Sequence, residues 1–462
     1  MTGKNVYFIG VGGIGMSAIA RHYRALGTDV AGYDRTRSAL TQALEAEGVT
    51  ISYADDPGSI PQQFRDPSRT LVVLTPAIPA DSAILAHFRK GGFRIVKRAV
   101  ALGELTEPFK TYCVAGTHGK TTTSTLVAHI LRNSKVGCSA FLGGISVNYE
   151  TNYWANTSSD AVVTEADEFD RSFLQLSPAA AVITAMDADH LDIYGTHAEV
   201  IKAFLEFAAK VRPGGSLIVK KGLPIGREDV AAGVNIITYA MMDPLADCHA
   251  AGVHVEGGRY VFDIHLPQGV IEGVRLGVPG IHNVENCVAA AALATVAGAS
   301  PSEVKEACAS FRGDKRRFEI WVETARAIVI DDYAHHPQEI KTTINAVRAL
   351  YPGRKLTVAF QPHLYTRTRD LADEFAEALS LADRAWLLDI YPAREAPIPG
   401  VSSQMLLGKM KPGVGKLSSK ERLAGDIVSE DFDIVLVMGA GDIDRLVPAV
   451  AASVKEAARI DN

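Results

Sequence analysis

The segment AGTHGKTTT, residues 115–123, lies between a short apolar run at residues 111–114 and a stretch with apolar side chains at helical spacing at residues 124–131. A strand, a glycine turn, a Lys-Thr pair and a helix in this order are typical of a phosphate-binding loop. Backbone N–H groups and a helix N-terminus then face the anion, while the lysine neutralises it and a threonine hydroxyl can hold Mg²⁺. The pattern predicts that the chain binds ATP or a close relative of ATP.

The spacing departs from the usual phosphate loop, which has four residues between its first glycine and the Gly-Lys-Ser/Thr ending. Gly116 and Gly119 have only two residues between them. A Gly-Lys-Thr sequence by itself also serves as a polar helix cap. The strand and helix on either side favour nucleotide binding through Gly116, Thr117, His118, Gly119, Lys120, Thr121 and Thr122.

Length and composition narrow the class of protein. A chain of 462 residues with 47% hydrophobic and 22% charged residues is expected to fold into several globular domains. The net charge is −6 and no long basic run occurs, which argues against a nucleic-acid partner. Neither a disulfide framework nor a zinc site can be made from five scattered cysteines, so a reducing, cytoplasmic location is expected.

No membrane segment is expected. The most apolar stretch, residues 287–299, is too short to cross a bilayer, and glycines interrupt the apolar run at the N-terminus that a signal peptide would need. The sequence does not distinguish a monomer from a homodimer.

A second glycine-rich loop, GVGGIG at residues 10–15, follows an apolar strand at residues 6–9 and opens a helix at about residues 16–26. Asp34 follows the next strand, residues 29–33, at about the distance where an acid reaches a ribose hydroxyl. The pattern fits a Rossmann unit that binds NAD, a loop that holds another nucleotide diphosphate such as a UDP-sugar, or glycines that serve only packing. The loop alone does not decide among them.

Polar residues follow several further strands, where ligands of open α/β sheets bind. Thr75 follows the strand at residues 71–74. Glu165 directly follows the strand at residues 160–164, beside the phosphate loop, where Mg²⁺ needs a hard oxygen ligand. His190 lies among acids after the strand at residues 181–184. Residues 146–159 are predicted to be a polar loop, and residues 234–278 a small antiparallel patch.

An alanine-rich helix is predicted from about residue 282 to residue 297. Its polar start can cap the helix, or it can pair with a base, because amide side chains match the hydrogen-bonding edge of adenine. The candidates are His282, Asn283 and Asn286.

Strands alternate with helices through the last third of the chain, at residues 327–330, 356–360, 385–388 and 434–438. This alternation predicts mostly parallel sheets. We expect an α/β protein of three domains: a Rossmann-like domain at residues 1–108, a phosphate-loop domain at 109–313 and a second Rossmann-like domain at 314–462.

These segments, in this order, resemble the Mur ligases, the ATP-dependent enzymes that build the peptidoglycan stem peptide. The resemblance covers essentially the whole chain, and GTHGKTT at residues 116–122 is the family's own form of the phosphate loop. Further matching segments are GVGGIGMS (residues 10–17), EADE (165–168), DHLD (189–192), DDYAHHP (331–337), QPHLYTRT (361–368) and EAPI (395–398).

The resemblance implies a role for each candidate residue. The N-terminal loop would hold a UDP-sugar and not NAD, through Gly10, Gly12, Gly13, Ile14, Gly15, Asp34, Thr75 and His118. ATP would also meet His282, Asn283, Asn286, Arg317 and Asp332. One or two Mg²⁺ ions would bind at Thr121, Glu165 and His190. The amino acid would bind at Tyr333, His335, His363 and Arg367, and catalysis would depend on Lys120, His190, His335 and Arg367.

Two departures from related ligases bear on these roles. Where relatives place a carbamylated lysine, this chain has Phe204 and Leu205, so no such group is expected. Where some members carry an arginine beside the amino-acid site, this chain has Leu364. Arg367 is therefore the better candidate for the amino-acid carboxylate, because its planar fork can make two parallel hydrogen bonds.

The implied reaction joins L-alanine to UDP-N-acetylmuramate at the expense of ATP, through an acyl phosphate. The alternative within the family is the recycling ligase that joins a tripeptide to the same UDP-sugar. From other classes, a dehydrogenase built on the N-terminal loop would leave Lys120 and Glu165 without a task. A non-catalytic phosphate-loop switch would not explain the histidines and arginine of the last third.

Overall fold

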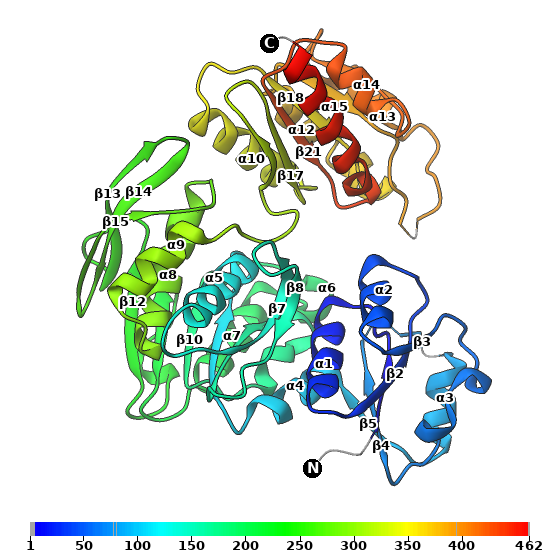
Figure 1. The fold of residues 1–462 in the computed structure, drawn as a ribbon, viewed down its shortest axis with the longest axis vertical. Coiled ribbons are helices and arrows are strands. Elements are labelled where there is room, and N and C mark those ends of the chain that lie inside the picture. The colour runs from blue at the N-terminus through cyan, green and yellow to red at the C-terminus, as the bar shows by residue number, and fades with distance from the viewer. Residues whose placement is uncertain (1–4, 77, 80, 394, 461–462) are drawn as a thin grey trace. The chain divides into compact units, whose positions relative to one another are not determined.

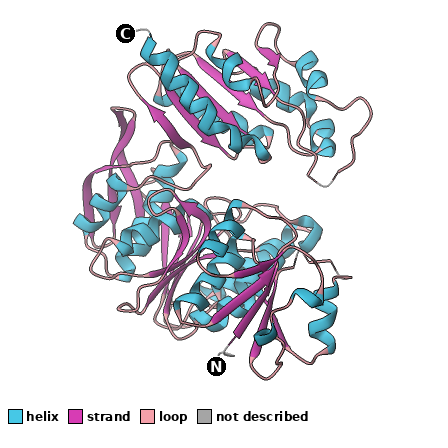
Figure 2. Ribbon diagram, turned by 45° about the vertical axis from the view of Figure 1, so that its right-hand side comes forward, coloured by secondary structure: helices cyan, strands magenta, loops and turns pink. Residues whose placement is uncertain are grey.

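The computed structural model describes residues 5–76, 78–79, 81–393 and 395–460. The chain forms two compact units. Unit 1 consists of Met1–Val253, Phe262–Arg275 and Val284–Phe311, and unit 2 of His254–Val261, Leu276–Asn283 and Arg312–Asn462. Figures 1 and 2 show three sheets with helices packed around their strands. The predicted α/β class, with mostly parallel sheets, is confirmed.

The first sheet of unit 1 is parallel, with strand order β3-β2-β1-β4-β5. Its central strands pair Ile9 with Tyr33 on one side and with Leu74 on the other, so their carboxyl ends meet at one edge. The strands are β1 (Asn5–Ile9), β2 (Asp29–Tyr33), β3 (Thr50–Ser52), β4 (Thr70–Leu74) and β5 (Arg94–Lys97), and the helices are α1 (Ile14–Ala25), α2 (Ala39–Ala46), α3 (Ala83–Lys90) and α4 (Arg98–Thr106).

The second sheet has the order β15-β14-β13-β12-β11-β10-β6-β9-β7-β8. Strand β6 (Lys110–Ala115) pairs in parallel with β9 (Ala161–Ala166) and β10 (Ala180–Ile183), and the phosphate loop follows it. The other strands are β7 (Ser139–Ser146), β8 (Thr151–Trp154), β11 (Ser216–Lys220), β12 (Asn235–Ala240), β13 (Cys248–Glu256), β14 (Arg259–Leu266) and β15 (Gly269–Arg275). The helices are α5 (Lys120–Arg132), α6 (Leu191–Tyr194), α7 (His197–Ala208), α8 (His282–Ala297) and α9 (Pro301–Ser310).

The prediction of a polar loop at residues 146–159 is wrong for Thr151–Trp154, which forms β8 and pairs antiparallel with β7. Tertiary contacts satisfy the polar side chain in this strand. Asn152 is fully buried, donates to the carbonyl of Ile14 at 2.6 Å and to Ser17 Oγ at 3.1 Å, and accepts from Arg21. These contacts join β8 to α1, and the two sheets of unit 1 share one apolar core.

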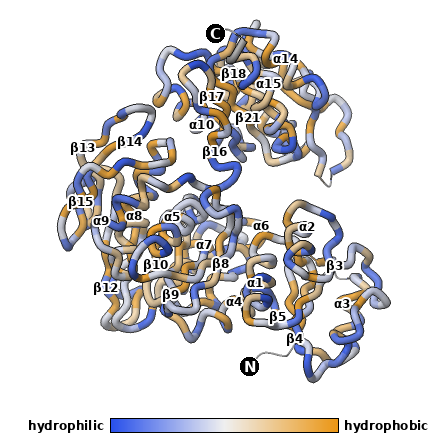
Figure 3. Tube along the Cα trace, in the orientation of Figure 1, coloured by the Kyte–Doolittle hydropathy of each residue, from blue (hydrophilic) through white to orange (hydrophobic). Residues whose placement is uncertain are grey.

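The third sheet, in unit 2, has the order β16-β17-β21-β18-β19-β20 and is parallel except for the β16–β17 pair. Its central strand β21 consists of large apolar residues, which Figure 3 colours as hydrophobic. The strands are β16 (Glu319–Glu323), β17 (Ile328–Asp332), β18 (Leu356–Phe360), β19 (Arg384–Leu387), β20 (Gly415–Leu417) and β21 (Ile434–Met438). The helices are α10 (Pro337–Leu350), α11 (Tyr365–Asp370), α12 (Ala372–Leu379), α13 (Ser403–Lys409), α14 (Leu423–Val428) and α15 (Val447–Ile460).

Within the described part of the chain, no helix is both long and apolar enough to span a bilayer. Residues 234–278 form strands β12 to β15, as the β-rich pattern predicts. The prediction that this patch is antiparallel is wrong for β12, which pairs in parallel with β11 and with β13 and so continues the parallel part of the sheet.

Asp331 near the end of β17 provides a test of the buried polar contacts of unit 2. Burial raises the pKa of this carboxyl to about 7, although Arg316 Nε lies 3.7 Å from it and favours its charged form. In the unfolded chain the carboxyl ionises near its ordinary pKa of about 3.9. The stability that the neutral carboxyl contributes is therefore present below that pKa and is lost as pH rises through about 7.

We predict that Asp331→Asn, which stays uncharged, gains stability relative to the unsubstituted chain as pH rises from about 5 to 7. The gain has an upper bound of about 1.4 kcal/mol per pH unit. Denaturant unfolding of both chains across this range measures the difference. A difference that does not change with pH would contradict the prediction.

Candidate active site

The phosphate loop between β6 and α5 has a positive φ at two positions, a conformation that glycine adopts without strain. Gly116 has φ +138° and Gly119 has φ +77°. A Cβ on Gly116 would lie 1.9 Å from Thr184 Oγ1, and one on Gly119 would lie 2.8 Å from Asn286 Oδ1. Thr184 lies just past β10, and its hydroxyl also donates to the carbonyl of His118. The next parallel strand thus fixes the shape of the loop.

Lys120, the first residue of α5, is held at the loop by two acceptors. Its ammonium donates to the carbonyl of Gly116 at 2.7 Å and to Glu168 Oε1 at 2.9 Å. The lysine side chain is 14% exposed and that of Glu168 only 1%. An ammonium fixed at the N-terminus of a helix provides, with that terminus, a site for a phosphate group.

Glu168 lies in a loop whose backbone is constrained on both sides. Asp170 and Arg171 are both left-handed, each with φ 53°, which is costly for residues with a Cβ. The carbonyl of Glu168 accepts from Tyr194 Oη at 2.6 Å. Arg98 Nη2 donates to Asp167 Oδ2 at 3.0 Å, and the same guanidinium lies beside Gly15 of the N-terminal loop. Arg98 thus connects the N-terminal glycine loop to the acidic loop that follows β9.

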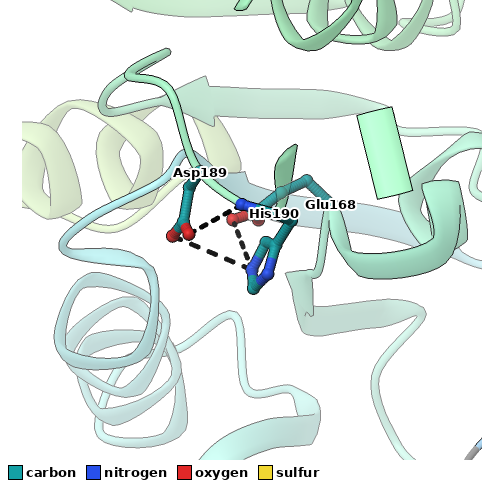
Figure 4. A group of neighbouring side chains, drawn as sticks. All are labelled: Glu168, Asp189 and His190. Atoms are coloured by element: carbon teal, nitrogen blue, oxygen red, sulfur yellow. Dashed lines mark hydrogen bonds and ion pairs between the residues drawn. The ribbon is translucent and has the colours of Figure 1, made fainter. Parts of the chain in front are cut away.

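Glu168, Asp189 and His190 form a group that can hold a metal ion (Figure 4). One potential ligand atom from each residue lies within 4.8 Å of the other two. His190 Nε2 lies 3.8 Å from each of the two carboxylates. Carboxylate oxygens are hard ligands and an imidazole nitrogen is an intermediate one, so this group suits a divalent cation.

The predicted metal residue Glu165 lies elsewhere, near the end of β9, with its carboxylate against Gly143. Thr121 is in the first turn of α5. The sequence predicts Glu165 as the partner of His190 at the metal site, whereas in the structure Glu168 and Asp189 lie beside this histidine. Both belong to acidic runs visible in the sequence, but only the left-handed turn at Asp170 and Arg171 shows which acid of its run points to His190.

In the N-terminal loop, the structure brings most of the predicted UDP-sugar residues together. Gly10 packs against Thr75, since a Cβ on Gly10 would lie 2.3 Å from Thr75 Cγ2. The N–H of Gly12 donates to Asp34 Oδ2 at 2.8 Å, and Gly13 caps α1, which begins at Ile14. His118 belongs instead to the phosphate loop, with Nε2 3.6 Å from Asp187.

The predicted adenine residues His282, Asn283 and Asn286 lie at the start of α8. Asn283 is buried and donates to the carbonyl of Pro279 at 2.6 Å, which is a capping contact. Asn286 lies against Gly119, as described above.

In unit 2, the carboxyl end of β17 carries Asp332 and Tyr333. Asp332 accepts from the N–H groups of Phe318 and Ala334 at 2.8 and 2.9 Å, so it fixes the backbone on both sides of the strand end. The guanidinium of Arg317 lies 5.6 Å from the centre of the Tyr333 ring. The structure therefore groups the predicted residues Arg317, Asp332 and Tyr333.

His335, His363 and Arg367 lie near these residues in the same unit. The His335 ring contacts those of Tyr333 and His363, with centroid distances of 5.2 and 6.2 Å. His335 Nδ1 donates to the carbonyl of Tyr333 at 2.9 Å, which leaves Nε2 as the proton acceptor. Burial lowers the pKa of both His335 and His363, which favours the neutral form of each imidazole.

Two buried atoms of this group have no hydrogen-bond partner in the described structure: His363 Nδ1 and Arg367 Nη1. Buried polar atoms are normally paired, and an unpaired guanidinium donor is particularly costly. An anionic ligand such as a carboxylate would satisfy Arg367.

Three α/β sheets and a lysine-bearing phosphate loop define a nucleotide-binding protein of the phosphate-loop class. The chain belongs to the Mur ligase family. Residues 5–110 match the model of the Mur ligase family catalytic domain, 114–294 that of the Mur ligase middle domain, and 316–441 that of the Mur ligase glutamate ligase domain.

Individual relatives extend over the whole chain. The UDP-N-acetylmuramate–L-alanine ligase of Phocaeicola vulgatus is 50% identical over 97% of both chains. Its counterpart from Porphyromonas gingivalis strain W83 is 49% identical over 96% of this chain and 97% of its own. The solved UDP-N-acetylmuramate-alanine ligase MurC of Thermotoga maritima is 26% identical, with a TM-score of 0.82, over 98% of this chain and 99% of its own. A murein peptide ligase from Psychrobacter arcticus shares the fold, with a TM-score of 0.66.

We predict that Glu168→Gln raises the Mg²⁺ concentration needed for half-maximal ATP turnover by about tenfold, because the site loses one anionic ligand. The measurement is a Mg²⁺ titration at saturating ATP. Glu206→Gln, at an exposed glutamate on α7, is the matched control and should leave the titration unchanged. The same Mg²⁺ requirement in all three chains would exclude Glu168 as a ligand.

Proposed function

We propose that this chain is an ATP-dependent amide ligase that joins L-alanine to UDP-N-acetylmuramate in peptidoglycan precursor biosynthesis, releasing ADP and phosphate. The main structural support is the presence of a lysine-bearing phosphate loop in unit 1 and, within unit 2, of a buried guanidinium atom without a hydrogen-bond partner. Relatives named for this reaction match the chain from end to end.

The carboxylate of the sugar must first be activated, because an oxide ion is a poor leaving group in acyl transfer. The carboxylate attacks the γ-phosphorus of ATP, ADP leaves, and an acyl phosphate forms. Two anions approach each other in this step, so the transition state needs fixed positive charge. Lys120 and the N-terminus of α5 supply it at the phosphate loop.

Mg²⁺ would bind at two places in unit 1. Thr121 and Glu165 would hold one ion beside the phosphate loop, and Glu168, Asp189 and His190 would hold the other. When bound, Mg²⁺ offsets the charge of the phosphate oxygens. The clustered oxygens and imidazole nitrogen fit a divalent cation, and Phe204, in the position expected for a carbamylated lysine in relatives, is buried in the apolar core.

The amine of L-alanine must be neutral when it attacks the acyl carbon, after which phosphate leaves. Arg367 binds the alanine carboxylate, and His335 or His363 accepts the ammonium proton. Both imidazoles suit that task because burial favours their neutral form. Tyr333 positions the ring of His335.

Further predicted residues bind the UDP-sugar and the nucleotide part of ATP. The UDP diphosphate binds the N–H groups at Gly10 to Gly15, with Thr75, Asp34 and His118 nearby, and ATP meets His282, Asn283, Asn286, Arg317 and Asp332. The three domains are residues 1–108, 109–313 and 314–462. Five free, buried cysteines support a cytoplasmic location, and the active form is a monomer or homodimer.

Phosphate release from ATP tests the proposal. With UDP-N-acetylmuramate present, we expect release to depend on L-alanine, because the acyl phosphate accumulates until an amine consumes it. Phosphate release in a parallel reaction, in which the tripeptide L-Ala-D-Glu-meso-diaminopimelate replaces L-alanine, tests the recycling reaction.

Turnover with the tripeptide alone would move the assignment to the recycling ligase. Release without the UDP-sugar would indicate a nucleotide switch. Tight binding of NAD without turnover would contradict the assignment of the N-terminal loop.

A further inference from the structure

Helix α11, which carries Arg367, lacks a cap of its own. The residue at its N-cap is Leu364, whose apolar side chain cannot accept a hydrogen bond from the first turn. Leu364 also has φ 73°, a region that residues with a Cβ rarely adopt. Something outside the helix must therefore fix its first turn if the guanidinium of Arg367 is to have a defined position.

Glu395 supplies that contact from a segment 29 residues further along the chain. Its Oε2 accepts the N–H of Thr366 at 2.9 Å, and its Oε1 accepts the hydroxyl of the same threonine. Both carboxylate oxygens are thus used on the residue that precedes Arg367. These hydrogen bonds lower the pKa of Glu395, so the carboxylate stays charged at the positive end of the helix.

Tyr391, which precedes Glu395 in the chain, is itself bonded to the segment between β18 and α11. The N–H of Leu364 donates to the carbonyl of Tyr391 at 3.0 Å, and the N–H of Tyr391 donates to the carbonyl of Pro362 at 2.8 Å. The rings of His363 and Tyr391 lie nearly parallel, 15° apart, with centroids separated by 5.7 Å. Glu395 therefore acts on a helix that is already aligned with its own segment.

The helix held in this way carries the arginine with the unsatisfied atom, Arg367 Nη1. Movement of its first turn would move the guanidinium relative to His363. A guanidinium that binds a carboxylate through two parallel hydrogen bonds tolerates little displacement.

We propose that Glu395 is a positioning residue for the amino-acid substrate: by holding Thr366, it fixes α11 so that Arg367 meets the carboxylate of L-alanine. The inference rests on the proposed function. Glu395 would contact neither ATP nor the UDP-sugar. Its substitution should therefore change the KM for L-alanine and leave the KM for ATP and for the UDP-sugar unchanged.

The test is the steady-state kinetics of Glu395→Ala and Glu395→Gln, with each substrate varied in turn. We expect Glu395→Ala to raise the KM for L-alanine by about tenfold to a hundredfold, because two hydrogen bonds to a charged acceptor are lost. The KM for ATP and for the UDP-sugar, and kcat at saturating alanine, should change by less than about twofold, within the range of neutral surface substitutions. Glu395→Gln keeps one acceptor oxygen and should show a smaller increase.

A second variant separates positioning from direct contact with the substrate. Thr366→Ala removes the hydroxyl group that donates a hydrogen bond to Glu395, and it should also raise the KM for L-alanine. The double variant should raise it less than the product of the two single effects, because both act through one contact. If Glu395→Ala destabilises unit 2 in thermal unfolding, Thr366→Ala and Glu395→Gln carry the test.

Two further variants calibrate the result. Arg367→Lys removes the planar fork and sets the size of a direct loss of the carboxylate contact. Glu377→Ala, an exposed glutamate on α12 that pairs with Lys341, is the matched control and should leave all constants unchanged.

An unchanged KM for L-alanine in Glu395→Ala, or equal increases for all three substrates, would overturn the inference. Effects of Glu395→Ala and Thr366→Ala that multiply in full in the double variant would overturn it as well, because the two side chains would then act independently. If the unsubstituted chain shows no alanine-dependent turnover, the proposed function fails, and the inference fails with it.

Discussion

A nearly buried ion pair between Lys120 and Glu168 connects the two strand ends that carry the candidate phosphate and metal sites of unit 1. The pair joins the start of α5 to the loop after β9, and these follow adjacent parallel strands. Removing two charges from water is costly, and their attraction compensates only when the geometry is good and further hydrogen bonds are made. The carbonyl of Gly116 and the hydroxyl of Tyr194 provide such bonds, to the ammonium and to the backbone of Glu168. The lysine is thus held at the loop before any phosphate arrives.

Strained backbone is concentrated around the candidate sites of both units. In unit 1, Asp170, Arg171 and His190 have positive φ, and they surround the carboxylate and imidazole of the candidate metal site. In unit 2, Leu364 and Ala393 have positive φ on the two segments that Glu395 joins. Such conformations persist only where surrounding contacts enforce them, and they place side chains that regular helices and strands could not.

The sequence predicts the parallel sheets well because buried parallel strands are nearly continuous apolar runs. Strands β2, β18 and β21 match their predicted ranges residue for residue, and the two glycine-rich loops follow β1 and β6 as predicted. Prediction failed where a polar residue is satisfied by distant partners, as for Asn152 in β8, which bonds to α1. In the candidate site too, residues with a local sequence pattern are predicted and residues selected by distant contacts are not. Glycines and the phosphate-loop lysine have local signatures, whereas the selection of Glu168 and the links Arg98–Asp167 and Glu395–Thr366 depend on contacts between residues far apart in sequence.

The central claim is that Lys120 and its loop promote transfer of phosphate to a carboxylate. The most direct test uses UDP-N-acetylmuramate labelled with ¹⁸O in both carboxylate oxygens, converted with ATP and L-alanine, with mass analysis of the phosphate released. Since the carboxylate oxygen that attacks phosphorus leaves with it when the amine attacks carbon, we predict one ¹⁸O atom in each phosphate. Phosphate without ¹⁸O would exclude an acyl phosphate, because ATP would then be hydrolysed without activation of the carboxylate.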